Sequence, residues 1–116
     1  MGASLLTGCE QPAFKAETAD DLRELLTQAE LIVANLRGAG SRAQTLLFLM
    51  DTIQGLMARL LETGVDLRAE ATRIETIERL LLSKDGVLVR EMQRLGGLAR
   101  AREPVKPPPA QWWWYL

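Results

Sequence analysis

Four glutamates in the second half of the chain come nearest, by type and spacing, to catalytic or metal-binding chemistry. They are Glu70, Glu75, Glu78 and Glu91, and Glu75 and Glu78 stand three positions apart in a helical stretch. Carboxylates at this spacing share one face of a helix, as the ligands of di-iron bundles do. Those bundles also need histidine, which this sequence lacks. We therefore interpret the glutamates as a solvated helix face and expect no metal ion and no cofactor.

The lack of histidine also bears on catalysis. It removes the commonest general base and every serine or cysteine nucleophile that a histidine would activate. Gly38-Ala39-Gly40-Ser41 could bind an anion at the start of a helix, but no lysine of the phosphate-binding kind follows it. A turn between two helices accounts for these residues. The sequence predicts a protein that is not an enzyme and has no catalytic residues.

The single cysteine lies near the N-terminus. Leu6-Thr7-Gly8-Cys9 is similar to the lipobox at which bacterial lipoproteins are acylated, but the stretch before it is short for a signal peptide and carries no basic residue. A lipid-anchored or membrane-peripheral accessory protein, attached through Cys9 or through the tryptophan-rich C-terminus, is thus an alternative interpretation. The lipid anchor would require that Met1 is not the natural start. One cysteine cannot form an intramolecular disulfide, which suits a reducing compartment, and we expect a cytoplasmic location.

Length and charge narrow the remaining classes. The chain has 116 residues, the size of one domain, and a formal net charge of −1. Nucleic-acid binding relies on clustered lysine and arginine, so we expect no nucleic-acid partner. No apolar stretch approaches the roughly 20 residues of a membrane-spanning helix. In the main interpretation we therefore do not expect the protein to bind a membrane.

Apolar residues at three- and four-residue steps predict two helices after an irregular segment over residues 1–17. The first runs over about 19–37, with Thr18 and Asp21 as its N-terminal capping pair. The second runs from 41 to about 63, where Ser41 and Gln44 form a capping box and Gly64 ends the helix. Its broad apolar stripe suits a helix with two neighbours. Phe48 lies outside this stripe, on the polar side.

A third helix is predicted over 67–102, with Asp66 as its cap. It carries an apolar residue at every seventh position, which is typical of a coiled-coil-like seam: Leu67, Ile74, Leu81, Leu88 and Leu95. Asp85-Gly86 is a helix-breaking signal within it. Because the column keeps its phase across this signal, we favour one continuous, kinked helix over two helices joined by a turn.

A second apolar line is expected on the back of this third helix, formed by Leu80, Val87 and Leu98. A helix over 67–102 would be about 54 Å long, whereas the first helix would be about 28 Å long. Two shorter helices could not cover it. The surplus length predicts a homo-oligomer or a protein partner bound along this helix.

The last residues, 103–116, form a separate C-terminal segment. Pro104 and Pro107–Pro109 favour an extended, polyproline-like conformation. This segment ends in Trp112, Trp113, Trp114 and Tyr115, and such a cluster needs an apolar surface. We expect at least two of the three indoles to be buried, with Trp112 and Trp114 in one groove and Trp113 either facing away or meeting a second chain. Phe48 is the candidate floor of that groove.

Together these patterns predict an all-α domain over 18–102. It consists of an antiparallel helical hairpin packed on a long third helix, followed by an extended tail. The function expected is that of a non-enzymatic assembly or adaptor subunit. Its contacts would come from the third helix and from the tail, which would dock on its own bundle, on a symmetry mate or on another protein. The residues expected to bind the partner are Phe48, Leu80, Val87, Leu98, Trp112, Trp113, Trp114 and Tyr115.

Overall fold

The computed structural model describes residues 17–116, and within this range the chain forms helices and no strands, so the all-α prediction is confirmed. Cys9, its lipobox-like context and most of the predicted irregular segment lie outside the described residues. No helix of the described part has the length and apolar character needed to cross a membrane. The helices are α1 (Ala19–Ala34), α2 (Ser41–Glu62), α3 (Arg68–Ser83), α4 (Asp85–Gln93), α5 (Leu98–Val105) and the short 3-10 helix η2 (Trp112–Tyr115).

The N-terminal cap of α1 is the predicted one, whereas the N-terminal cap of α2 is not. The Asp21 backbone N–H donates to the Thr18 hydroxyl at 3.1 Å, and the Thr18 N–H donates back to the Asp21 carboxylate at 3.1 Å. The capping box predicted at Ser41 is wrong, because Gly40 occupies the cap position and Ser41 is already helical. Gly40 has a φ of 60°, a backbone conformation that glycine adopts without strain. The helix begins at the predicted residue, but Gly40 and not Ser41 is its N-terminal cap.

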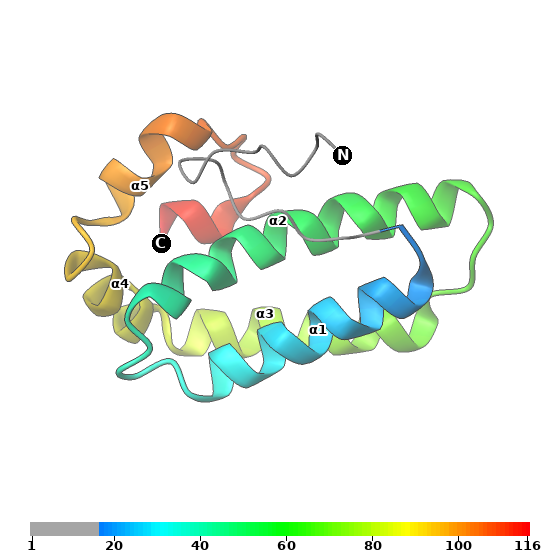
Figure 1. The fold of residues 1–116 in the computed structure, drawn as a ribbon, viewed down its shortest axis with the longest axis horizontal. Helices are drawn as coiled ribbons and strands as arrows, with labels where there is room; N and C mark the ends of the chain where they lie inside the picture. Colours follow the sequence, from blue (N-terminus) through cyan, green and yellow to red (C-terminus); the bar gives the residue numbers. More distant parts are fainter. Residues whose placement is uncertain (1–16) are drawn as a thin grey trace, which may run out of the picture.

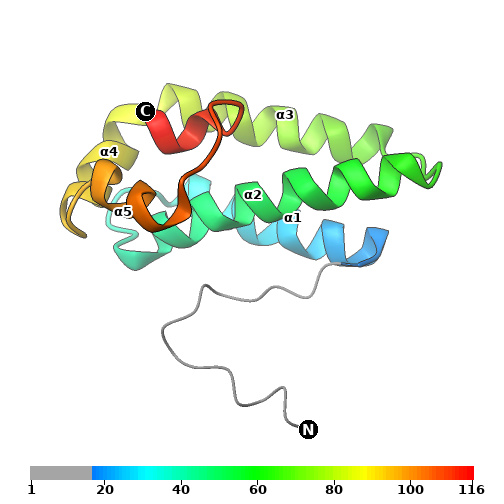
Figure 2. The same cartoon turned by 90° about the horizontal axis from the view of Figure 1, so that it is seen from above.

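The three longest helices surround one apolar core. α1 and α3 run in the same direction and α2 runs opposite to both (Figure 1). α1 packs along α2 and along α3, whereas α2 and α3 make no comparably extensive contact with each other (Figure 2). Each fully buried aliphatic side chain contributes about 1.5–3 kcal/mol. Those with almost no exposure include Leu22, Leu26 and Val33 of α1, Leu46, Met50 and Ile53 of α2, and Ile77 and Leu81 of α3.

The single third helix predicted over 67–102 is wrong. Lys84, with φ −114° and ψ 24°, ends α3 and begins α4, and Gly96 and Gly97 separate α4 from α5 with φ values of 104° and 98°. The break at Lys84 has a tertiary partner, because its ammonium group donates to the Val33 carbonyl near the end of α1 at 2.9 Å. That bond satisfies a carbonyl group that α1 itself leaves unpaired. The helix thus ends at Lys84, where a tertiary contact is available, although the heptad spacing of apolar residues continues beyond it.

The breaks also redirect the two apolar lines of the predicted helix. In the predicted seam Leu67, Leu81 and Leu88 are buried within this chain, while Leu95 is 39% exposed. The seam is therefore part of the internal core. The second line does not form one face: Leu80 is 37% exposed, Val87 is half-buried and Leu98 is buried in the core. The surplus helix length that predicted an oligomer is also lost.

The extended tail predicted for residues 103–116 is replaced by helical turns. α5 continues through Pro104, which falls in its last turn, and ends at Lys106 with a left-handed φ of 50°. Pro107–Pro109 then lead into η2, which lies beside α2 (Figure 1). The reversal at Gly96 and Gly97 is what returns the chain toward α2.

We expect Gly86→Ala to stabilise the protein by about 0.5–1 kcal/mol. Gly86 is helical within α4, its φ is not positive, and no atom lies within 4 Å of an added Cβ. Gly97→Ala is the matched control and should destabilise by about 1–2 kcal/mol, because it forces a side chain onto a φ of 98°. Urea denaturation of the three proteins measures both changes. A loss of stability in Gly86→Ala would contradict the assigned start of α4.

Candidate functional site

The C-terminal segment is anchored on α2 by its aromatic side chains. Trp113 and Trp114 are buried, with exposures of 1% and 0%, while Trp112 is half-buried and Tyr115 is exposed. The expectation of at least two buried indoles is met, but the predicted pair, Trp112 and Trp114, is wrong. The reason is local: consecutive residues of an extended strand alternate between faces, whereas η2 turns both Trp113 and Trp114 toward α2.

One carboxylate binds both buried indoles. Asp51 of α2 accepts a hydrogen bond from the Trp113 Nε1–H at 2.8 Å and from the Trp114 Nε1–H at 3.1 Å. Burial raises the pKa of Asp51 above its ordinary value, although the two indole donors act in the opposite direction. Buried polar groups need partners, so Asp51 is what allows two tryptophans to enter an otherwise apolar contact.

Further contacts hold the segment to α2 and α5. Phe48 meets Trp114 edge to face, with the ring centroids 5.3 Å apart, so the residue expected to form the floor does lie against an indole. The Arg102 guanidinium donates to the Trp114 carbonyl at 3.0 Å and lies 4.8 Å from the centre of the Tyr115 ring. The structure thus places Phe48 against the aromatic residues. Leu98 is buried in the same core cluster as Trp113 and Trp114, Val87 packs against that cluster, and Leu80 is exposed.

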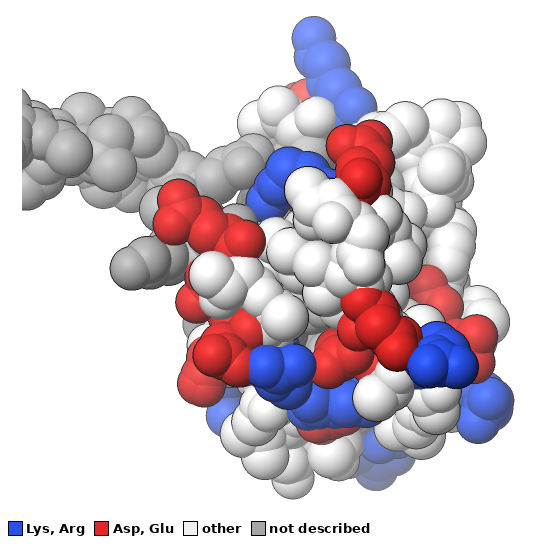
Figure 3. Space-filling model, turned by 90° about the vertical axis from the view of Figure 1, so that its right-hand side faces the viewer, with Lys and Arg blue, Asp and Glu red and all other residues white. Residues whose placement is uncertain are grey.

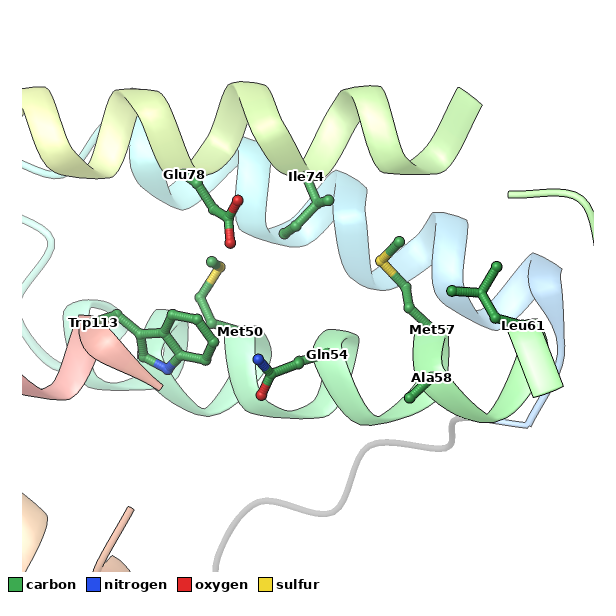
Figure 4. Close-up of a pocket in the computed structure, with 8 residues that line it drawn as sticks. All are labelled: Met50, Gln54, Met57, Ala58, Leu61, Ile74, Glu78 and Trp113. Atoms are coloured by element: carbon green, nitrogen blue, oxygen red, sulfur yellow. The ribbon is translucent and has the colours of Figure 1, made fainter. Parts of the chain in front are cut away.

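Next to this anchor an apolar hollow of about 260 Å³ opens between α2 and α3. Figure 4 shows Ile74 and Glu78 entering it from α3, Met50 and Met57 from α2, and Trp113 at one end. A second hollow of about 220 Å³ shares Met57 and Leu61 with the first. We call the two hollows together the α2–α3 groove, and its lining residues are Met50, Gln54, Met57, Ala58, Leu61, Val65, Asp66, Leu67, Arg68, Ala71, Ile74, Glu78 and Trp113.

The groove follows directly from the helix packing. The lining residues of α2 follow one another at three- and four-residue steps and include Met50, Gln54, Met57 and Leu61. The lining residues of α3 are spaced in the same way and include Ala71, Ile74 and Glu78. Because α2 and α3 make no extensive contact with each other, the two hollows remain between these stripes. From Met50 to Leu61 the groove extends about 17 Å along α2, or three helical turns.

Sequence reasoning missed the groove, although one signal pointed to it. The apolar stripe of the second helix is wider than contact with one neighbour requires, and α1 covers only part of it. Leu61 is 56% exposed and Met57 is half-buried at the uncovered edge. The predicted second neighbour was the third helix, but in the structure this edge lines the groove.

Glu78 is the charged group at the Trp113 end of the groove. It is half-buried, and within residues 17–116 it has no hydrogen bond and no ion pair. Burial raises the pKa of Glu78, and the nearby Glu75 carboxylate raises it further. The charged form of Glu78 is therefore less favourable in the folded protein than it is in water.

Other acidic side chains have partners, and two correct the interpretation of a solvated glutamate face. Glu70 is only 8% exposed and accepts a hydrogen bond from Arg23 at 3.0 Å. Glu91 is only 2% exposed and accepts the backbone N–H groups of Gly38 and Gly40 at 2.9 and 3.1 Å, which lower its pKa. Glu91 thereby ties α4 to the α1–α2 turn.

At the opposite end, acidic and basic side chains are interleaved around the start of α1 and the α2–α3 turn (Figure 3). Asp66, for example, pairs with Arg68 at 2.9 Å. In the described part of the chain no group of three or more metal-ligating side chains is placed to hold a metal ion.

Comparison of the chain with protein-family models, with curated proteins and with solved structures gives no significant match.

We expect Asp51→Ala to destabilise the protein by about 2–4 kcal/mol, because it leaves two buried indole N–H groups without an acceptor. Asp51→Asn keeps one acceptor oxygen and should cost less than half as much. Urea denaturation followed by circular dichroism measures the loss, and exchange of the indole N–H signals in NMR spectra locates it at η2. Unchanged indole exchange in Asp51→Ala would contradict the anchoring role.

We expect Glu78→Gln to stabilise the free protein at pH 7 by a few tenths of a kcal/mol, a small value because water still screens this half-buried group. The pKa of Glu78 in the folded state lies above its ordinary value of 4.5. The folded state therefore holds more protons than the unfolded state between these two pKa values, and stability falls as pH rises through that window. The advantage of Glu78→Gln should disappear at pH 4. Denaturation midpoints at both pH values test this, and an equal gain at pH 4 would contradict it.

Proposed function

We propose that this chain is a non-enzymatic interaction protein that binds a helical segment of a partner protein in its α2–α3 groove. This retains the adaptor or assembly role expected from the sequence but moves the contact surface. The proposal depends on one observation: the groove stays open and apolar although the aromatic C-terminal segment is already seated beside it. Water against such a surface is unfavourable, and a partner would displace it.

A helix is the occupant that the groove fits best. Its walls are two helices, and each of them is also packed against α1. A further helix laid between α2 and α3 would complete a four-helix arrangement, in which apolar residues of each helix meet in a common interior. Helix-in-groove recognition uses anchors at positions such as i, i+4 and i+7, and this spacing suits a groove of about three turns.

The lining also suits a protein partner. Met50 and Met57 are unbranched and flexible, so they adapt to different apolar side chains. Leu61 widens the apolar surface toward Leu67 and Ala71. The aromatic segment, which the sequence interpretation assigned to a partner or symmetry mate, forms in this proposal the closed end of the groove.

The test begins with selection of helix-forming peptides of about 18 residues from a displayed library, using the full chain as bait. We expect the selected peptides to carry apolar residues at helical spacing. Met57→Glu should weaken binding of a selected peptide at least tenfold, because it places a charge in the groove. Leu31→Glu is the matched control: Leu31 is 62% exposed on α1, outside the groove, and its replacement should leave affinity unchanged.

Circular dichroism first verifies that both variants are folded. Peptides whose affinity is the same for Met57→Glu and for the unchanged protein would contradict the proposal, and so would a selection that yields no binder. Light scattering tests whether a second copy of the chain occupies the groove instead. A mass of twice 12.9 kDa that falls to 12.9 kDa in Met57→Glu would assign the groove to a second copy of the chain and overturn the choice of a separate partner.

A further inference from the structure

We propose that Glu78 makes the α2–α3 groove selective for a helix that carries a lysine or arginine at the Trp113 end. This inference rests on the proposed function and adds the charge of the partner. It is carried by the position of Glu78 in the groove and by the absence of any partner for its carboxylate in residues 17–116.

Glu78 is placed to meet the occupant. It projects from α3 into the first hollow, opposite Met50 and beside Trp113 (Figure 4). The rest of this hollow is largely apolar, and its other polar side chain, Gln54, is neutral. A helix lying on Met57 and Ile74 would therefore bring one of its own side chains to the Glu78 carboxylate.

Two basic groups of this region, Arg73 and Arg102, are already engaged. Arg73 of α3 makes two hydrogen bonds to Glu30, at 2.6 and 2.9 Å, and faces α1. Arg102 is held by the Trp114 carbonyl and the Tyr115 ring. The neighbour that does influence Glu78 is Glu75, and it adds negative charge. An occupant is thus the source from which a compensating cation can come.

Covering the groove would amplify this requirement. An occupant displaces water from around Glu78, and an unpaired carboxylate becomes more costly as its surroundings become less polar. A lysine or arginine on the occupant offsets that cost by forming a buried ion pair. It can also lie against the indole of Trp113, since cations are attracted to aromatic rings. Neutral or acidic occupants would be rejected, so Glu78 would set specificity partly by exclusion.

The geometry also sets where the basic residue should stand. Glu78 is seven positions from Ala71, which lies in the second hollow, so the two differ by about 10 Å along α3. A helix beside α3 should therefore carry its basic residue about two turns from the apolar residue that contacts Ala71.

The test is a double-mutant cycle with a selected peptide. Its basic residue is replaced by glutamine, and both peptides are titrated against the unchanged protein, Glu78→Gln and Glu75→Gln by isothermal calorimetry. We expect Glu78→Gln to weaken binding of the basic peptide about tenfold and to strengthen binding of the glutamine peptide severalfold, because it removes the unpaired carboxylate that excludes a neutral occupant. Glu75→Gln is the control, because an exposed carboxylate one turn away is screened by water and should change the affinity of the basic peptide less than threefold.

The outcomes separate this inference from the proposed function. Equal weakening of both peptides by Glu78→Gln would mean that Glu78 only shapes the groove, and the charge selectivity would be wrong. Selected peptides without a basic residue at the Trp113 end would also overturn it. In both cases sensitivity to Met57→Glu would still support binding in the groove, whereas loss of that sensitivity would remove the groove itself.

Discussion

The requirement that a buried N–H group be hydrogen bonded determines how this chain ends. Two indoles can leave water together only where an acceptor already stands in the apolar surface, and the Asp51 carboxylate supplies one for both Trp113 and Trp114. With η2 held at this point, α5 packs against it through Arg102, and the turn at Gly96 and Gly97 has a defined path to follow. The same anchor places Trp113 at the end of the α2–α3 groove.

Polar groups also connect the other helices and turns by hydrogen bonds. Lys84 satisfies a carbonyl near the end of α1, and Glu91 satisfies two backbone N–H groups in the α1–α2 turn. Arg73 and Arg23 connect α3 to α1 through Glu30 and Glu70. Apolar burial supplies most of the stabilisation, and these bonds select one arrangement of the helices among several that would bury similar area. Glu78 differs from this set because it has no such bond in the described residues.

Periodicity predicted the first two helices well, and capping predicted the start of the first. The pair Thr18 and Asp21 is local, and the apolar steps of α1 follow from its packing on one core. The heptad column outweighed the Asp85-Gly86 signal in the prediction, although the chain does break there. The break at Lys84 is supported by the Val33 carbonyl, 51 positions away, which the local pattern does not contain. Likewise, the hydrophobicity of three tryptophans indicated burial. Which two are buried depends on the turn of η2 and on Asp51, and neither is encoded in the local pattern. The groove exists because α2 and α3 do not pack closely against each other. The patterns in the sequence do not show which pairs of helices pack closely and which do not.

The position of the tryptophans has a practical consequence. All three are consecutive, and the rest of the chain has none, so the ultraviolet emission of the folded protein arises at one place. Two of them share the Asp51 carboxylate, and one borders the groove. The intrinsic fluorescence of the unlabelled protein is therefore a local signal: it reports whether the C-terminus is seated and whether the adjacent surface is wet or covered.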